Sequence, residues 1–139
     1  MIKSFMNVKT VYKIALPSVS DKRGVLTSIE ANQSIPIEIK RVFYMHHITQ
    51  DRGGHAHIET DQVIIPISGS IKVKVFDGVK EDVYVLDNCT EGLFVPRLTF
   101  CDLHDFSKDA VCLVLANTHY DMGKSLRNLS DFMEYIKRK

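Results

Sequence analysis

Short apolar runs separated by turn-forming residues constrain this chain most strongly. Each run is rich in Val, Ile, Phe or Tyr and is bounded by Gly, Asn, Asp or Ser, which is typical of strands between turns. In Ile71–Phe76 apolar residues alternate with lysines, so one face of that strand should be buried and the other solvated. Repeated short strands predict a β-sandwich or a β-barrel. The predicted strands are Ile39–Met45, Gln62–Ile67, Ile71–Phe76, Asp82–Leu86, Leu93–Val95 and Ala110–Ala116.

Local signals predict some of the connections and the C-terminal end. Asp77-Gly78 is a favourable hairpin turn after the strand at Ile71–Phe76. Pro66 within an apolar run indicates a sheet edge or a bulge. A single helix is expected at the C-terminus, with Ser130 as its N-cap and apolar residues from Phe132 to Ile136 on one side. The expected fold is therefore all-β, an antiparallel barrel or jelly roll with a short C-terminal helix, as one domain over residues 1–139.

Composition and charge exclude several classes of protein. The chain is 45% hydrophobic and 25% charged, as in a soluble globular domain, and its formal net charge is only +1, which argues against a nucleic-acid partner. No apolar stretch has the length of a membrane span or the form of a signal peptide. Cys89, Cys101 and Cys112 are odd in number and contain no CxxC, so a disulfide framework is not expected. We expect a cytoplasmic protein with neither a nucleic-acid nor a membrane partner.

The segment Arg52–Gln62 carries the clearest chemical signal. Residues two apart on a strand share a face, so His55 and His57 should project together. Taken alone, such a pair is as readily a pair of solvent-facing or incidentally buried histidines. Here glycines precede it, Asp61 follows it, and Gly69 comes after the next apolar run, which together resemble the first cupin motif.

Cupin motifs raise the question of a metal. Two imidazoles with the carboxylate of Asp61 are a plausible start for a metal site, and His104 in the later segment is the candidate for a further ligand. The short side chain of Asp61 and the nearby Arg97 weaken this interpretation. The sequence therefore favours a site without a metal.

The motif is part of a wider resemblance. Residues from about 23 to 136 resemble the dTDP-4-keto-6-deoxyhexose 3,4-ketoisomerases, a family of metal-independent cupins. An isolated Arg-Gly or His-x-His is a weak signal, whereas the set in this order is distinctive. The matching segments are Arg23–Leu26, Ile35–Tyr44, Arg52–Gln62, Gly92–Val95, Leu103–Ser107, Val114–Ala116 and His119–Asp121.

The resemblance implies a reaction on a dTDP-linked 4-keto-6-deoxy sugar that needs no cofactor. The ketone moves from C4 to C3 through an enediol-like intermediate, which requires a base near C3, an acid at C4 and donors for the developing oxyanion. We expect His57 to take the C3 proton and return it at C4. His55 would shuttle the hydroxyl proton or stabilise the enediolate, and Tyr44 is a third candidate catalytic residue, with a core aromatic as its alternative role.

The same resemblance suggests residues that bind the substrate. Arg41 and a neighbouring tyrosine are expected at the site, although Arg41 alternatively forms a surface salt bridge. Arg23 could pair with the pyrophosphate or only stabilise a turn, and Arg52 could reach a phosphate or Asp61.

Two further residues complete the expected site. His104 could line the barrel, and Tyr120 could close the edge of the site or simply end a strand. Neighbouring His46 and His47 fall outside the matched segments and are expected in a loop.

The chain departs from the family pattern at four places. Phe100-Cys101 stands where relatives commonly have Trp-His, and a thiol is a poor substitute for an imidazole near neutral pH. Pro96-Arg97 stands where relatives commonly have Gly-Pro, Asp61 stands in place of the usual glutamate, and Met122 stands where a glutamate is expected after Tyr120-Asp121. These changes leave the reaction class intact but leave open the C4 configuration of the product and the role of Cys101.

Other functions remain compatible with the motif. The alternatives are a dTDP-sugar 3,5-epimerase, a metal-dependent cupin oxygenase and a non-catalytic sugar-binding cupin. Exposed strand edges favour pairing with a second copy, so we expect a homodimer, and exchange of the N-terminal strand between subunits is one form it could take. The resemblance implies that an aminotransferase acts next, toward 3-amino-3,6-dideoxy sugars of surface glycans such as lipopolysaccharide O-antigens or S-layer glycans.

Overall fold

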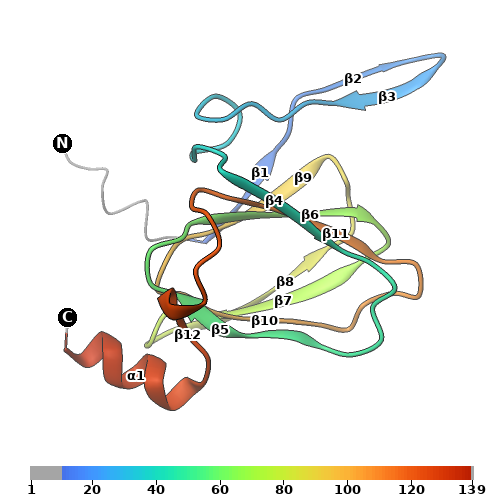
Figure 1. Ribbon diagram of the computed structural model, residues 1–139. Coiled ribbons are helices and arrows are strands. Elements are labelled where there is room, and N and C mark those ends of the chain that lie inside the picture. Colours follow the sequence, from blue (N-terminus) through green and yellow to red (C-terminus); the bar gives the residue numbers. More distant parts are fainter. Residues whose placement is uncertain (1–10, 139) are drawn as a thin grey trace.

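Two antiparallel sheets packed face to face form the body of the protein (Figure 1). The computed structural model describes residues 11–138. The first sheet has the order β1-β9-β6-β11-β4 and the second has the order β12-β5-β10-β7-β8. The elements are β1 (Tyr12–Ala15), β2 (Ser18–Asp21), β3 (Gly24–Thr27), β4 (Arg41–Met45), β5 (Arg52–His57), β6 (Gln62–Ser68), β7 (Ile71–Phe76), β8 (Glu81–Leu86), β9 (Glu91–Val95), β10 (Phe100–His104), β11 (Val111–Ala116), the 3₁₀ helix η2 (Met122–Lys124), β12 (Ser125–Leu126) and α1 (Leu129–Lys137). The predicted all-β fold with a short C-terminal helix is confirmed, as a jelly-roll sandwich rather than a closed barrel.

The space between the sheets holds the main core. The alternation predicted for β7 is confirmed, because Ile71, Val73 and Val75 are buried while the intervening lysines are partly exposed. They pack against residues such as Ile64 and Val114 of the first sheet. Burying each side chain of this size contributes roughly 1.5–3 kcal/mol.

A second apolar layer covers the outer face of the first sheet. Ile35 and Ile37, in the irregular segment before β4, pack on Val63, Ile65 and other residues of the sheet. Strand β6 is therefore buried on both faces, which explains its uninterrupted apolar run.

Pro66 lies at a bulge, as predicted. Val111 pairs with Ser68 and Cys112 with Pro66, so Ile67 has no partner across β11. On the other side of β6 the pairing with β9 ends at Ile64, so the missing N–H of the proline falls outside that ladder.

The C-terminal helix begins earlier than predicted. Asn128, not Ser130, is the N-cap, because the Asn128 side chain accepts a hydrogen bond from the backbone N–H of Asp131. Asn is as good an N-cap as Ser, and the first-turn position leaves Ser130 exposed. Fully buried Phe132 packs against Phe100 and Phe76 and fixes the helix beside β5.

The β2–β3 hairpin projects from the sandwich and was not predicted as strands (Figure 1). Its side chains Val19, Val25 and Leu26 are 66%, 62% and 66% exposed. Within residues 11–138, no helix combines the length and apolar character needed to cross a membrane.

Candidate active site

Strand β5 places His55 and His57 together on one face, as the sequence predicted. Their rings meet edge-on, with 4.9 Å between centroids and an interplanar angle of 90°. Both are half-buried and line a cavity of about 120 Å³ between the sheets, here called the inner cavity. Apolar side chains form most of its wall, and Arg52, Thr60, Gln62, Thr99 and Cys101 supply the polar groups; the apolar lining residues are Phe43, Met45, Ile64, Val95, Pro96, Leu103 and Val114.

A glycine allows β5 to approach β10 closely beside the histidines. Gly53 has a φ of 93°, and a Cβ at this position would lie 2.7 Å from the carbonyl oxygen of Cys101. The register between β5 and β10 shifts at this point, between Cys101 and Asp102. Any other residue at 53 would push the strands apart, so the glycine fixes where the histidines lie.

A second, polar cavity adjoins the first at His57. This outer cavity carries the cations Arg41 and Lys124 as well as the carboxylates of Glu59 and Asp121. His57 and Thr60 line both cavities, so His57 stands at their junction; the remaining lining residues are Thr118, His119, Tyr120 and Ser125.

Both ring nitrogens of His57 have polar neighbours. Its Nε2 lies 3.2 Å from the amide nitrogen of Gln62, and its Nδ1 lies 3.4 Å from the hydroxyl of Ser125. Burial lowers the pKa of His57 to about 4, with smaller contributions from His55, Arg41 and Arg127.

The neighbouring histidine is in a similar state. Burial, with a smaller contribution from Arg127, also lowers the pKa of His55, against the opposing effects of Gly53 and Asp102. Both imidazoles are therefore neutral at pH 7 and able to accept a proton.

Arg41 lies between two aromatic rings. Its guanidinium carbon is 5.3 Å from the ring centroid of Phe43 and 5.4 Å from that of Tyr120. Its Nε is buried without a hydrogen-bond partner among the described residues. The residue also lines the outer cavity, so its guanidinium is a cation available to an anionic ligand there.

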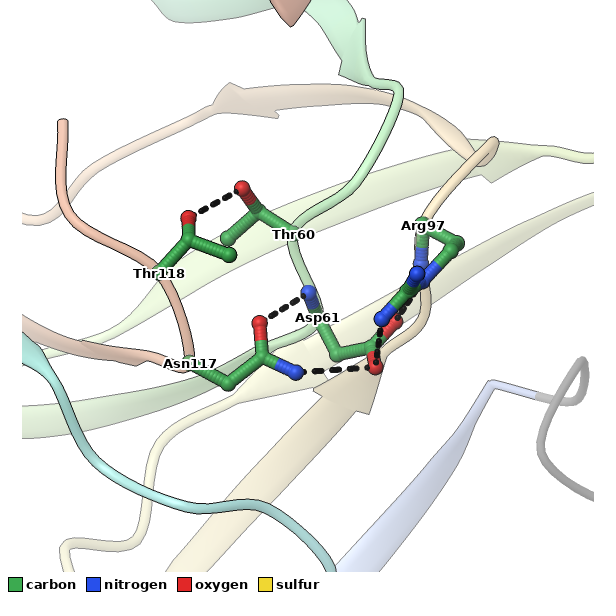
Figure 2. Close-up of polar contacts among 5 residues, drawn as sticks. All are labelled: Thr60, Asp61, Arg97, Asn117 and Thr118. Atoms are coloured by element: carbon green, nitrogen blue, oxygen red, sulfur yellow. Dashed lines mark hydrogen bonds and ion pairs between the residues drawn. The ribbon is translucent and has the colours of Figure 1, made fainter. Parts of the chain in front are cut away.

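Asp61, considered above as a metal ligand, is instead fully engaged in holding loops together (Figure 2). Its carboxylate accepts hydrogen bonds from the backbone N–H, Nε and Nη2 of Arg97, at 2.8, 3.2 and 3.1 Å, and from the Asn117 side chain at 3.1 Å. Asn117 also accepts from the backbone N–H of Asp61, and Thr118 bonds Thr60 beside it.

The structure bears on two suggestions made for Asp61, a contact with Arg52 and a place in a metal site. The partner of Asp61 is Arg97, so the suggested contact between Arg52 and Asp61 is wrong. Over residues 11–138 no group of three or more His, Cys, Asp or Glu side chains is placed to hold a metal ion.

Of the residues predicted to join the histidines, the structure brings Arg52 to the inner cavity and Arg41 and Tyr120 to the outer cavity. Tyr44 lies elsewhere: alternation along β4 turns it outward, 63% exposed, beside His46. The tyrosine beside Arg41 is therefore Tyr120, which comes from a distant part of the sequence.

Two other predicted residues also lie outside both cavities. Arg23 sits in the turn of the β2–β3 hairpin, paired with Asp21 at 2.6 Å. His104 follows Leu103 on β10, and because Leu103 lines the inner cavity, alternation turns His104 away.

The sequence prediction missed Gln62 and Ser125. Gln62 was detectable, since it lies two residues before inward-facing Ile64 on β6. Ser125 carries no local signal, because only the pairing of β12 with β5 brings it opposite His57.

Cys101 lies in the inner cavity, paired across the sheet with His55. Burial raises the pKa of its thiol to about 12, assisted by Asp102 and Cys112. The thiol therefore stays protonated at neutral pH and is not a base.

Comparison with known proteins shows the family of this chain. The family model "FdtA: WxcM-like, C-terminal" matches residues 8–137. A TDP-4-oxo-6-deoxy-alpha-D-glucose-3,4-oxoisomerase of Aneurinibacillus thermoaerophilus is 37% identical over 127 residues, covering 90% of this chain and 91% of that protein.

Solved structures give the same result. The sugar 3,4-ketoisomerase QdtA of Thermoanaerobacterium thermosaccharolyticum, in complex with TDP, superposes with a TM-score of 0.88 at 33% identity, covering 92% of this chain and 95% of that one. A histidine-to-asparagine variant of QdtA has been solved with TDP-4-keto-6-deoxyglucose. The TDP-quinovose 3,4-ketoisomerase WlaRB of Campylobacter jejuni gives a TM-score of 0.87 at 34% identity, with coverages of 91% and 98%. The resemblance found in the sequence is thus confirmed, and the chain belongs to the FdtA family of sugar 3,4-ketoisomerases.

Proposed function

We propose that this protein converts a dTDP-4-keto-6-deoxyhexose into the 3-keto isomer, without a cofactor, using His57 as the base. The observation that carries the proposal is the position of His57: a neutral, half-buried imidazole at the junction of a mostly apolar cavity and a polar one. Family membership favours this reaction over the 3,5-epimerase, oxygenase and binding-protein alternatives.

The chemistry needs only proton transfers. The C4 ketone acidifies the C3–H bond, and Nε2 of His57 takes that proton to leave an enediolate across C3 and C4. Return of the proton from His57 to C4, with transfer of the C3 hydroxyl proton to the C4 oxygen, moves the carbonyl to C3. His55, with its ring 4.9 Å away, is placed to shuttle the hydroxyl proton or to donate to the enediolate oxygen.

The two cavities suit the two ends of the substrate. The inner cavity would take the deoxyhexose, with its methyl group against apolar walls such as Phe43 and Met45. The outer cavity would take the diphosphate, through the guanidinium of Arg41 and the ammonium of Lys124. Arg52 borders the inner cavity and is a further candidate to bind the substrate, as Tyr120 is in the outer one.

Three residues predicted for the site lie away from the two histidines in the single chain. Tyr44, Arg23 and His104 do not reach the histidines of their own chain, so any role of theirs depends on substrate-bound or dimeric arrangements. Two copies joined through the β2–β3 hairpin would bury Val19, Val25 and Leu26, and would carry Arg23 onto the second copy. We therefore keep a homodimer of single-domain subunits as part of the proposal.

Exchange of an N-terminal strand stays a prediction. In the single chain β1 pairs with β9, and residues 1–10 lie outside the described part.

The proposal also includes the compartment of the protein and the fate of its product. The three cysteines are free, which fits a reducing cytoplasm. A C3 ketone is the group that an aminotransferase converts into an amine, so the product fits the synthesis of 3-amino-3,6-dideoxy sugars for surface glycans.

The proposal is tested by NMR with dTDP-4-keto-6-deoxyglucose in deuterated water. The expected result is a new 3-keto species with deuterium at C4, or deuterium at C3 of the recovered substrate. Product formed in ordinary water keeps its C4 proton, whose coupling gives the product configuration. Absence of both conversion and exchange with this substrate and its C4-keto analogues would refute the proposed reaction.

A further inference from the structure

Strand β12 brings a hydroxyl to the far side of His57. Ser125 pairs with His57 and Leu126 with Ala56, and the backbone N–H of Ile58 donates to the carbonyl of Lys124 at 2.9 Å. The preceding turn is fixed by Asp121, whose side chain accepts from the N–H of Gly123 at 3.0 Å. The Ser125 hydroxyl is thus held beside Nδ1 of His57 by backbone pairing.

The two neighbours of His57 define which nitrogen carries the proton. An amide nitrogen only donates, so the Gln62 nitrogen, 3.2 Å from Nε2, is placed to give an N–H hydrogen bond to that ring nitrogen. A neutral imidazole then carries its proton on Nδ1, which donates to the Ser125 oxygen at 3.4 Å. The lone pair of Nε2 consequently lies on the Gln62 side, and Gln62 lines the inner cavity.

We propose that Ser125 is a positioning residue that, together with Gln62 on the opposite ring nitrogen, holds His57 in its Nδ1–H tautomer, so that the Nε2 lone pair faces the sugar in the inner cavity. This inference rests on the proposed function for its catalytic consequence, but the tautomer itself does not depend on the reaction. In other proton-transfer sites a carboxylate orients the catalytic histidine through a hydrogen bond, and here the neutral hydroxyl of Ser125 takes that place. A neutral partner leaves the imidazole without the stabilisation of its charged form that a carboxylate would give.

Ser125 also borders the outer cavity, so a direct contact with the substrate is the competing explanation. The two roles differ in kinetics. A positioning residue acts on the proton-transfer step and lowers kcat, whereas a substrate contact made equally in the ground state raises KM and leaves kcat unchanged.

The test compares Ser125→Ala with Ser125→Thr, which restores a hydroxyl, and with Ser130→Ala, an exposed serine in α1 as the matched control. The ¹⁵N chemical shifts of the His57 ring at pH 7 report its tautomer, and steady-state assays with dTDP-4-keto-6-deoxyglucose report kcat and KM. We expect wild-type His57 to be protonated at Nδ1. Ser125→Ala should populate the Nε2–H tautomer and lose about tenfold in kcat at nearly constant KM. Ser125→Thr and Ser130→Ala should behave as wild type.

Three results would overturn the inference: a wild-type His57 protonated mainly at Nε2, an unchanged tautomer in Ser125→Ala, or an effect of that variant confined to KM. If the wild-type protein does not isomerise the sugar but Ser125→Ala still changes the tautomer, the proposed reaction fails while the hydrogen bond to His57 stands.

Discussion

His57 and Asp61 lie close together in one motif but have opposite surroundings. The Asp61 carboxylate accepts several hydrogen bonds from Arg97 and Asn117 and borders neither cavity. His57 has two long polar contacts, at 3.2 and 3.4 Å, and borders both cavities. A polar side chain whose bonding capacity is filled by the protein stabilises the fold, whereas one with weak partners beside open space remains available for a substrate. We therefore expect Asp61 to stabilise the fold, and the proposed chemistry rests on His57.

The largest expected effect separates activity from stability at His57. Replacing it in His57→Asn removes the proposed base, so kcat should fall by about 10³-fold, within the range for loss of a general base. The thermal unfolding midpoint at pH 7.5 should change little, measured by circular dichroism. The control is His46→Asn, an exposed loop histidine, which should keep full activity. Comparable activity of the two variants would break the assignment.

The second prediction concerns stability as the pH falls. Burial holds the pKa of His57 at about 4 in the folded protein, against 6.5 for an unperturbed histidine, so the unfolded chain binds the proton first. The free energy of unfolding should therefore be greatest above pH 6.5 and decrease as the pH falls toward 4, by roughly 3 kcal/mol in total from this residue.

Urea unfolding at successive pH values in wild type and His57→Asn measures that contribution. The difference between the two curves isolates His57 from His55, whose pKa is lowered in the same direction. Parallel curves between pH 7 and pH 4.5 would contradict a buried, neutral His57.

Substitution of Asp61 should lower stability and largely preserve activity, which is the reverse of the effect expected for His57→Asn. Asp61→Ala leaves the Arg97 guanidinium and a backbone N–H without their acceptor, so it should lower the free energy of unfolding by about 2 kcal/mol. The activity of the folded fraction should remain within about threefold of wild type.

The matched control is Asp21→Ala, which breaks the fully exposed pair with Arg23 and should leave the unfolding midpoint unchanged. A large drop in kcat for Asp61→Ala, with stability preserved, would instead place Asp61 in the chemistry.

The smallest effect is expected at Cys101. Its thiol lines the inner cavity but stays protonated, since its pKa is raised to about 12, so Cys101→Ala should lower kcat/KM by less than about tenfold. Iodoacetamide at pH 8 should modify exposed Cys89 first, detected by mass spectrometry. Rapid labelling of Cys101 with loss of activity would show that this thiol is reactive.

Local patterns were sufficient for most of the sandwich. The alternation of β7, the Asp77-Gly78 turn after it and the bulge at Pro66 all follow from neighbouring residues. The exposed β2–β3 hairpin was missed because its valines and leucine do not face a core, so no burial pattern marks it.

Strand geometry alone predicted only those site residues that share a strand, whereas the family resemblance was needed for Arg41 and Tyr120. The pairing of His55 with His57 follows from strand alternation. Ser125 and Tyr120 reach His57 and Arg41 through a short strand pairing and a loop, which leave no periodic signal. The same alternation that joins the histidines turns Tyr44 outward, so family resemblance at that position did not predict where its side chain lies.

The most direct test follows the C3 proton itself. The substrate is dTDP-4-keto-6-deoxyglucose with ordinary hydrogen at C3, dissolved in deuterated water. Its C3 and C4 NMR signals are recorded over time with wild type, His57→Asn and His46→Asn. The account predicts loss of the C3 proton signal and a 3-keto product with wild type and His46→Asn, and at least a 10³-fold slower reaction with His57→Asn. Loss of the C3 proton at the wild-type rate in His57→Asn would show that another group is the base.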